Sequence, residues 1–279
     1  MTSSPPQNIQ APTNPQSTGL KGSQARQISY LPVIAAYDRW AQVYDTDSNA
    51  LQALDDSELG TLLTRFSSLT RRSGIGGRIV DLGCGTGRNT MKLLSTPGAD
   101  IVGLDLSAQM LSIARTRCQQ VFESLIVEER CSSLKFENFD ILSFPTIPSD
   151  ALNANGIIST LVLEHIELSK FFSTARDMLT DDGYLLITNM HPDMGKQTQA
   201  GFVDPDTGTK TQTDSHIHTI EGVVEESGRQ NFELVDDVIV RKVEKDMVEK
   251  LGERAVKWIG VNCWFGMILQ KKSGEGPGT

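Results

Sequence analysis

The sequence lacks features that would place it in a secreted or membrane-bound class. It has no run approaching the roughly 18 apolar residues of a membrane span, and no apolar segment follows Met1. Its four cysteines form no Cys-x-x-Cys pair and no regular framework, which is typical of free thiols in a reducing compartment. The first 37 residues contain no acid, as in a transit peptide, but only two basic residues, Lys21 and Arg26. We therefore expect a cytoplasmic protein that binds no membrane.

An excess of basic side chains is also absent. The 279 residues include 26 Lys and Arg against 35 Asp and Glu, which gives a formal net charge of −9. Proteins that bind nucleic acid through its phosphates usually carry a basic face, so we expect no nucleic-acid partner. Hydrophobic residues make up 38% and charged residues 22%, an ordinary globular composition with enough apolar material for a sizeable core.

The ends of the chain differ in character from the rest. Residues 1–27 are rich in Ser, Thr, Pro, Gln and Asn, and we expect them to be a disordered tail, with a second short tail at 273–279. Residues 28–72 predict a helical segment, with a second helix over 57–70. Its first helix has one apolar face, formed by Ile34, Tyr37, Trp40, Ala41 and Tyr44.

An alternation of short apolar strands and helices follows. The predicted strands are 78–83, 100–105, 134–142, 156–161 and 184–189. The predicted helices are 89–94, 108–127 and 168–179, and Asp182-Gly183 is a predicted turn. Strands separated by such helices form right-handed βαβ units, so the sequence predicts a mostly parallel sheet of the α/β class.

The last third of the chain is less regular. Residues 192–218 begin with a long polar stretch, which predicts a functional loop or lid over the site. A helix over 220–227 and strands over 232–240 and 263–270 complete the predicted domain, with a charged helical insert between the two strands.

The most informative segment is the glycine-rich turn after the first predicted strand of the sheet. Gly83, Gly85 and Gly87 alternate there, which allows the backbone to pass close to a ligand at the carboxyl end of a parallel strand. A dinucleotide fingerprint would read G-x-G-x-x-G, but the third position here is Arg88. Asp81, two residues before the first glycine, would also repel a pyrophosphate. The turn therefore argues against a nicotinamide-dependent oxidoreductase.

Three carboxylates follow successive strands and together describe a ligand. Asp81 suits a cationic amine, Asp105 can accept hydrogen bonds from two ribose hydroxyls, and Asp140 can accept one from an adenine amino group. A ligand with an amine, a ribose and an adenine but no phosphate is S-adenosylmethionine. Asp140 also has the ordinary reading of a loop residue after a strand.

The motifs VDLGCGTG, GLDLS, NFDIL and STLVLEHI resemble those of class I S-adenosylmethionine-dependent methyltransferases. The resemblance covers roughly residues 30–272 and is nearest to the small-molecule branch, which includes ubiquinone/menaquinone-biosynthesis-like and natural-product methyltransferases. It implies a methyltransferase domain over 28–272 with a Rossmann-like, seven-stranded, mostly parallel sheet of order 3-2-1-4-5-7-6, whose last strand is antiparallel. The segment YDRWAQVYD resembles the N-terminal helical lid of that family.

The resemblance also implies which residues contact the cofactor. They are Tyr37, Tyr44, Asp81, Gly83, Cys84, Gly85, Asp105, Leu106, Met110, Asp140, Ile141 and Ser159. The aromatic residues have the alternative of core packing, which we assign to Trp40. Ser159 has the equal alternative of capping a strand end.

The histidines are candidates for the acceptor side of the site. His165 follows the fourth strand of the sheet and has the pKa of a general base for a hydroxyl or thiol, its alternative being a polar loop residue or helix cap. His191 ends the fifth strand and could face the same pocket. His216 and His218 alternate, but no third ligand is spaced to complete a metal site, so we expect none.

Taken together, the sequence predicts an enzyme that transfers a methyl group from S-adenosylmethionine to an O, N or S atom of a small molecule. The expected acceptor is a secondary metabolite or another biosynthetic intermediate. The cofactor already carries the chemical activation, so the protein mainly aligns the nucleophile and excludes water. Two alternatives stay open here: a regulatory protein that keeps the fold without turnover, and an enzyme that modifies a protein.

Overall fold

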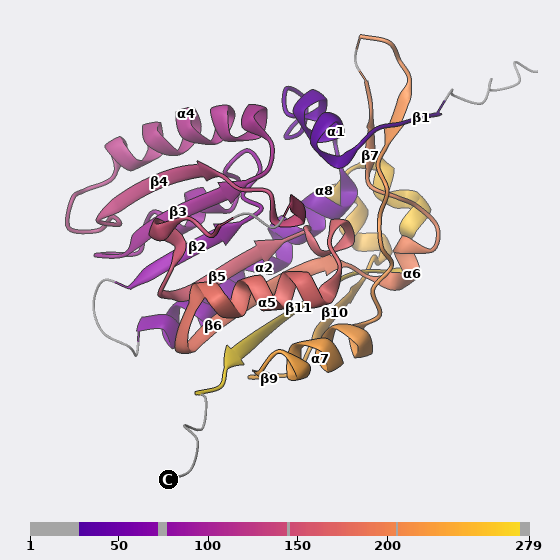
Figure 1. Ribbon diagram of the computed structural model, residues 1–279. Coiled ribbons are helices and arrows are strands. Elements are labelled where there is room, and N and C mark those ends of the chain that lie inside the picture. Colours follow the sequence, from indigo (N-terminus) through magenta and orange to yellow (C-terminus); the bar gives the residue numbers. More distant parts are fainter. Residues whose placement is uncertain (1–27, 72–76, 144–145, 205, 274–279) are drawn as a thin grey trace, which may run out of the picture.

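A central sheet is built from the alternating apolar segments, with helices on both of its faces (Figure 1). The computed structural model describes residues 28–71, 77–143, 146–204 and 206–273, so the predicted tail of residues 1–27 lies outside the described residues. The strands of the sheet are β2 (Arg78–Leu82), β3 (Asp100–Asp105), β4 (Ser133–Asn138), β5 (Ala154–Thr160), β6 (Leu179–Met190), β9 (Phe232–Leu234), β10 (Ile239–Lys242) and β11 (Asn262–Lys271).

The strand order is β10-β11-β6-β5-β2-β3-β4, and β9 pairs with β11 further along the same strand. The pairs among β2 to β6 are parallel, whereas β11 runs antiparallel to β6, β9 and β10. When β9 and β10 are taken as two parts of one interrupted strand, this order corresponds to 3-2-1-4-5-7-6. The mostly parallel α/β sheet predicted from the sequence is therefore present.

Helices cover the two faces because both faces of the inner strands are apolar. Ile79 of β2 packs on the side of α2 (Ala50–Thr70) and α4 (Ala108–Ser124). Its neighbour Val80 packs on the opposite side, where α5 (Leu168–Met178) and α7 (Ile220–Arg229) lie. The short helix α3 (Thr90–Leu93) follows the glycine turn.

Helix starts are fixed by side-chain caps. Asn49 Oδ1 accepts hydrogen bonds from the backbone N–H groups of Leu51 (3.0 Å) and Gln52 (3.4 Å), so α2 begins at Ala50. We predicted a start at residue 57, because the cap was not recognised in the sequence. Ser107 Oγ likewise accepts from Met110 N (3.1 Å) at the start of α4.

Several predicted strand boundaries were wrong. The predicted turn at Asp182-Gly183 lies inside β6, where the pairing with β5 is irregular and Asp182 has a φ of 60°. The predicted strand 134–142 ends at Asn138, and a 3₁₀ helix (Ile141–Ser143) follows it. The predicted strand 232–240 is divided into β9 and β10. In the last two cases the apolar pattern continues where the backbone pairing does not, whereas at Asp182-Gly183 the strand continues through residues that interrupt the apolar pattern.

The segment 192–218, which we predicted to be a polar loop, instead contains regular structure. Helix α6 (Pro192–Gly195) is followed by a hairpin of β7 (Gly201–Val203) and β8 (Lys210–Gln212), and β1 (Ile28–Tyr30) pairs with β8 in parallel. The hairpin turn is stabilised by Asp204, whose Oδ1 accepts from Asp206 N and Thr207 N at 3.0 Å each. Such a side-chain-closed turn gives a polar sequence a defined structure.

The remaining elements lie near the carboxyl ends of the parallel strands (Figure 1). Helix α1 (Val33–Trp40) is shorter than the predicted helical face and is followed by turns over 41–46. The insert between β10 and β11 contains α8 (Val248–Leu251) and two 3₁₀ helices. The 3₁₀ helices of the described chain other than the one after β4 are Ser149–Ala151, Leu163–His165, Lys245–Met247 and Glu253–Trp258.

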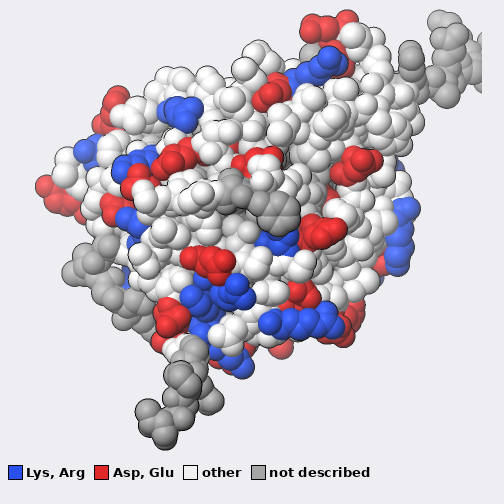
Figure 2. Space-filling view, in the orientation of Figure 1, with Lys and Arg blue, Asp and Glu red and all other residues white. Residues whose placement is uncertain are grey.

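The described residues include no helix that is both long and apolar enough to cross a membrane. Figure 2 shows acidic and basic side chains interspersed on the face of the molecule seen in Figure 1.

A buried ion pair connects the glycine turn to the rest of the fold. Asp55 of α2 is fully buried, and its Oδ2 accepts a hydrogen bond from Arg88 Nη2 at 2.8 Å. Its Oδ1 accepts from Thr188 Oγ1 of β6 (2.6 Å) and from Trp264 Nε1 of β11 (2.8 Å). One carboxylate therefore joins the turn, a helix and two neighbouring strands.

We expect Asp55→Asn to destabilise the fold by about 3 kcal/mol, because it removes the fully buried partner of the Arg88 guanidinium and leaves the more exposed Asp56 carboxylate, 2.7 Å from Arg88 Nη1, to balance that charge. Urea unfolding followed by circular dichroism measures this change. The control is Asp236→Asn, whose ion pair with Arg65 is exposed to solvent and should leave the free energy of unfolding nearly unchanged. Equal effects of the two substitutions would contradict the role given to Asp55.

Candidate functional site

The glycine turn after β2 has the geometry that a close ligand requires. Gly83, Gly85 and Gly87 all have positive φ, at 78°, 55° and 81°. A Cβ at Gly85 would meet no atom within 4 Å, so the backbone there faces open space. A Cβ at Gly87 would lie 2.6 Å from Cys118 Sγ, so only glycine lets the turn pack against α4.

Asp81 is a buried carboxylate with one oxygen left free. The residue is 1% exposed, and its Oδ2 accepts a hydrogen bond from Thr90 Oγ1 at 2.6 Å. Its Oδ1 is buried and has no hydrogen-bond partner within the described chain. Burial raises the pKa of Asp81 to about 7. An orphaned carboxylate oxygen of this kind fits a cationic group such as an amine.

Asp105 lies in the same part of the site, at the end of β3. Its Oδ2 accepts from Gly85 N and its Oδ1 from Ser107 N, both at 2.8 Å. Burial raises its pKa to about 6, although these backbone hydrogen bonds act in the opposite direction. Asp140 lies further along the edge and accepts from Leu142 N at 2.8 Å, next to the buried Ile141. The three predicted acids therefore lie in or directly after three neighbouring strands, Asp81 near the end of β2, Asp105 at the end of β3 and Asp140 after β4.

An aromatic cluster covers this crevice. Trp40 and Tyr44 lie edge to face with ring centroids 5.0 Å apart, and Tyr37 lies 5.5 Å from Trp40. Trp40 also stacks on Phe202 of β7, at 5.3 Å and an interplanar angle of 12°. Met110 of α4 packs against the same cluster. Trp40, which we assigned to the core, is indeed buried, but it also links α1 to the hairpin.

Two acids of the segment YDRWAQVYD fasten it to the site. Asp38 Oδ1 accepts a hydrogen bond from Ser107 Oγ at 2.6 Å, at the start of α4. Asp45 Oδ1 accepts from Thr86 Oγ1 of the glycine turn at 3.0 Å. The sequence analysis considered only the aromatic residues of this segment. Each tyrosine of the segment is followed by an aspartate, and this pattern could have predicted the two attachments.

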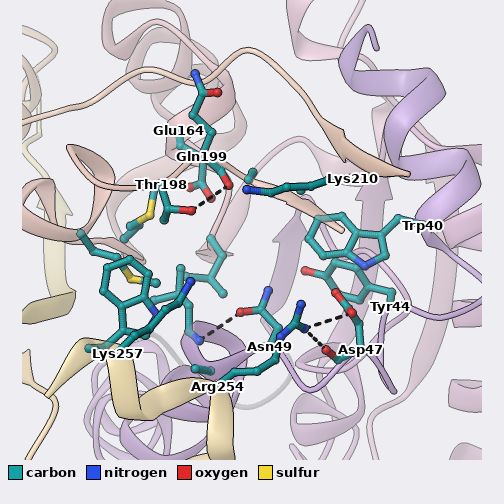
Figure 3. Close-up of a pocket in the computed structure, with 18 of the residues that line it drawn as sticks. Trp40, Tyr44, Asp47, Asn49, Glu164, Thr198, Gln199, Lys210, Arg254 and Lys257 are labelled. Atoms are coloured by element: carbon teal, nitrogen blue, oxygen red, sulfur yellow. Dashed lines mark hydrogen bonds and ion pairs between the residues drawn. The ribbon is translucent and has the colours of Figure 1, made fainter. Parts of the chain in front are cut away.

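A cavity of about 140 Å³ lies beside the aromatic cluster (Figure 3). Its walls come from α1, the residues before α2, the 3₁₀ helix Leu163–His165, the end of β6, the hairpin and the insert. The apolar part of the lining includes Trp40, Leu161, Met190, Met194 and Trp258. The polar part includes Tyr37, Tyr44, Asn49, Glu164, Lys210, Arg254 and Lys257.

Glu164, which the sequence analysis did not single out, lines this cavity. It is 4% exposed, and its Oε2 has no hydrogen-bond partner among the described residues. The neighbouring His165 is not among the lining residues, and its Nε2 lies 2.8 Å from Tyr37 Oη. The sequence analysis pointed to this segment through His165, whereas the residue that lines the cavity is the one before the histidine.

Other predicted site residues make local contacts. Ser159 Oγ donates to Leu82 O at 2.8 Å, which joins two strand ends. His191 Nδ1 accepts from Asp193 N at 3.1 Å at the start of α6, and neither residue lines the cavity. Cys84 is buried in the turn, and Leu106 lies half-buried after β3.

The second histidine pair also packs locally. The rings of His216 and His218 stack with centroids 5.4 Å apart, and His218 Nε2 lies 3.0 Å from the carbonyl oxygens of Leu163 and Ile166. Within the part of the chain that the structure describes, no three His, Cys, Asp or Glu side chains gather as metal ligands would.

Comparison with known proteins shows which family the chain belongs to. The family model described as "Methyltransferase domain" matches residues 74–272. The chain belongs to this methyltransferase family. An uncharacterised methyltransferase of Emericella nidulans is 42% identical over 274 residues, covering 90% of this chain and 95% of the relative. A demethylmenaquinone methyltransferase of Tropheryma whipplei is 29% identical over 158 residues, covering 56% of this chain and 58% of the relative.

Solved structures share the fold of this methyltransferase. The magnesium protoporphyrin IX methyltransferase of Synechocystis, solved with bound S-adenosylhomocysteine, matches with a TM-score of 0.54 and 15% identity. The match covers 86% of this chain and 94% of that one. The predictions of a class I methyltransferase, of its α/β fold and of an enzyme are therefore confirmed, and the cofactor is S-adenosylmethionine.

The raised pKa of Asp81 makes the stability of the cofactor-free methyltransferase depend on pH. Because the folded-state pKa of about 7 lies above the ordinary aspartate value of 3.8, the folded protein holds this proton more tightly than the unfolded chain does. This contribution to stability is fully present below the ordinary pKa of 3.8 and is lost as the pH rises from there through the folded-state pKa of about 7.

We therefore expect Asp81→Asn to be more stable than the wild type at pH 8, by on the order of 2–4 kcal/mol, and to lose this part of the pH dependence. Urea unfolding between pH 5 and pH 8 measures it. Thr90→Val removes the hydrogen bond that lowers the Asp81 pKa, so it should move the transition to higher pH. A wild-type pH profile in Asp81→Asn would show that this carboxyl does not titrate as described.

Proposed function

We propose that this methyltransferase transfers the methyl group of S-adenosylmethionine to an O, N or S atom of a small biosynthetic intermediate bound in the cavity of Figure 3. The observation that carries this proposal is the partly open cavity between the aromatic cluster and the insert, which is lined by Glu164, a buried residue with one unpartnered carboxylate oxygen among the described residues. A volume of about 140 Å³ suits a small molecule better than a protein surface. The Tropheryma relative is likewise named for a small molecule, demethylmenaquinone.

The residues at the strand ends would hold the cofactor. Asp81 Oδ1 would accept from its cationic amine, Asp105 from the ribose hydroxyls and Asp140 from the adenine amino group. Ile141 and Met110 would pack against the adenine and the ribose side. The sulfonium group of S-adenosylmethionine supplies the activated methyl group. The protein therefore needs only to place the nucleophile in line with that methyl group and to exclude water.

The aromatic cluster and the hairpin would provide the water exclusion. Tyr37 and Tyr44 cover the cofactor side, and the hairpin covers the acceptor side through the contact of Trp40 with Phe202. This arrangement supports the proposal that residues 28–72 form a helical lid, which closes the site together with the segment 192–218. Exclusion of water also strengthens each charged contact inside the site.

Glu164 is our candidate for the group that accepts a proton from the acceptor. Glu164 lines the cavity and its buried Oε2 has no hydrogen-bond partner among the described residues, whereas His165 does not line the cavity and its Nε2 lies 2.8 Å from Tyr37 Oη. We therefore move the predicted role of general base from His165 to Glu164. His165 would instead position Tyr37 in the lid.

We also propose that the enzyme works in the cytoplasm. All four cysteines are free and buried, as is usual where thiols stay reduced. Burial raises the pKa of Cys118 to about 12 and of Cys131 to about 11, so neither is a reactive thiolate at neutral pH.

The first test is cofactor binding to Asp105→Ala. Loss of two hydrogen bonds to a charged acceptor should weaken S-adenosylhomocysteine binding roughly a hundredfold, since each such bond contributes about 1.5–3 kcal/mol. Titration calorimetry measures the dissociation constant, and a melting curve confirms that the variant is folded. An unchanged dissociation constant would mean that another residue holds the ribose. Turnover detected by mass spectrometry with candidate acceptors separates an active enzyme from a regulatory protein.

The second test compares Glu164→Gln with His165→Gln on a hydroxyl or thiol acceptor. A missing general base should lower kcat about 10²–10⁴-fold in Glu164→Gln and remove the acidic limb of its pH–rate profile. His165→Gln should lower kcat less than Glu164→Gln does and should keep the acidic limb, because the His165 side chain would act only by positioning Tyr37. The opposite result would return the role of base to His165.

A further inference from the structure

Two ammonium groups line the cavity without an acidic partner. Lys210 comes from β8 and Lys257 from the 3₁₀ helix Glu253–Trp258, and within the described ranges neither forms an ion pair or a hydrogen bond. Arg254, from the same 3₁₀ helix, is different because it pairs with Asp47 Oδ1 at 3.1 Å. Figure 3 shows the nitrogen atoms of Lys210 and Lys257 pointing toward the middle of the cavity from different walls.

The positive charges at this end of the cavity act on one another. Lys257 lies over the Trp258 ring at 4.6 Å from its centroid, which holds its ammonium group at the wall. Its pKa is lowered, first by partial burial and then by the charges of Lys210 and Arg254. Uncompensated charges that repel each other in a partly enclosed space form a binding site for an anion.

The opposite charge lies at the cofactor end. Burial raises the pKa of Tyr37, and the charges of Glu164 and Asp105 raise it further, so all three groups are near neighbours. Glu164 is therefore close to the predicted ribose-binding acid, while the two lysines belong to the hairpin and the insert. The cavity thus offers one carboxylate near the predicted ribose-binding acid and two ammonium groups, one on the hairpin and one on the insert.

On the basis of the proposed function, we propose that the methyl acceptor carries an anionic group, a carboxylate or a phosphate, which binds between Lys210 and Lys257. Its nucleophilic atom would then lie at the Glu164 end. Asn49, whose Oδ1 is used in capping α2, lines the cavity as well and can donate its amide to the same anion. A purely cationic acceptor would meet both unpaired ammonium groups and is disfavoured.

The test uses small charged probes and their neutral counterparts on the complex of the full chain with S-adenosylhomocysteine. Tricarballylate and glycerol 3-phosphate are titrated by calorimetry, with tricarballylamide and glycerol as the neutral pair. We expect the anions to bind the wild type and the neutral molecules to bind much more weakly. Which of the two anions binds more tightly distinguishes a carboxylate from a phosphate acceptor.

The variants assign this binding to the two lysines. The double variant Lys210→Gln/Lys257→Gln should bind the anions about tenfold or more weakly, because both charge-assisted contacts are lost. Lys250→Gln makes the same kind of charge change in α8, does not line the cavity, and should bind like the wild type. Lys210→Arg/Lys257→Arg should keep most of the affinity. S-adenosylhomocysteine affinity should be the same in all four proteins.

Two results would overturn the proposal. One is that neither anion binds the wild type in preference to its neutral counterpart, and the other is that the double glutamine variant binds the anions as well as Lys250→Gln does. Either result would leave the proposed methyl transfer untouched. Failure of the wild type to bind S-adenosylhomocysteine would count against the proposed function itself.

Discussion

The Asp55–Arg88 ion pair is the interaction on which the geometry of the site depends. It is buried, and its carboxylate also receives hydrogen bonds from β6 and β11. A charge taken out of water in this way is tolerated only where its partners are complete, so the pair specifies one position for the turn that carries Gly83 to Gly87. The open backbone at Gly85 and the free oxygen of Asp81 owe their places to that position.

The acidic and basic side chains of the site lie on different segments and would bind different ligands. Asp81 and Asp105 are buried where a cationic cofactor is expected. Burial raises their pKa values because it disfavours the charged carboxylates, and a positive ligand bound beside them would stabilise the charged form. Lys210 and Lys257, which have no acidic partner among the described residues, line the cavity from the hairpin and the insert. The net charge of −9 gives no hint of this, because it averages over a surface on which both signs are mixed.

The central fold and the cofactor turn could be predicted because their signals are local. Asp81, the alternate glycines and Asp105 are defined by their spacing from a strand, and the structure places them together. The acceptor side could not be predicted in the same way. Lys210, Lys257 and Glu164 come from three separate segments, and only the pairing of β1 with β8 and the position of the insert bring their side chains to one cavity. Polar residues in a hairpin also resemble those of a loop, so the structure of 192–218 depends on the Asp204 turn rather than on an apolar pattern.

The stacked pair of Trp40 and Phe202 has a consequence for the kinetic cycle. In the proposed arrangement one ring belongs to the segment that covers the cofactor and the other to the segment that covers the acceptor, and the two planes are 12° apart. Neither ring keeps that contact if its own segment moves alone. If the two segments cover the two ligands as proposed, opening for one ligand would loosen the cover of the other, and the two ligands would share a single gate. An enzyme with one gate for two ligands favours an obligatory sequence of loading and unloading over independent exchange.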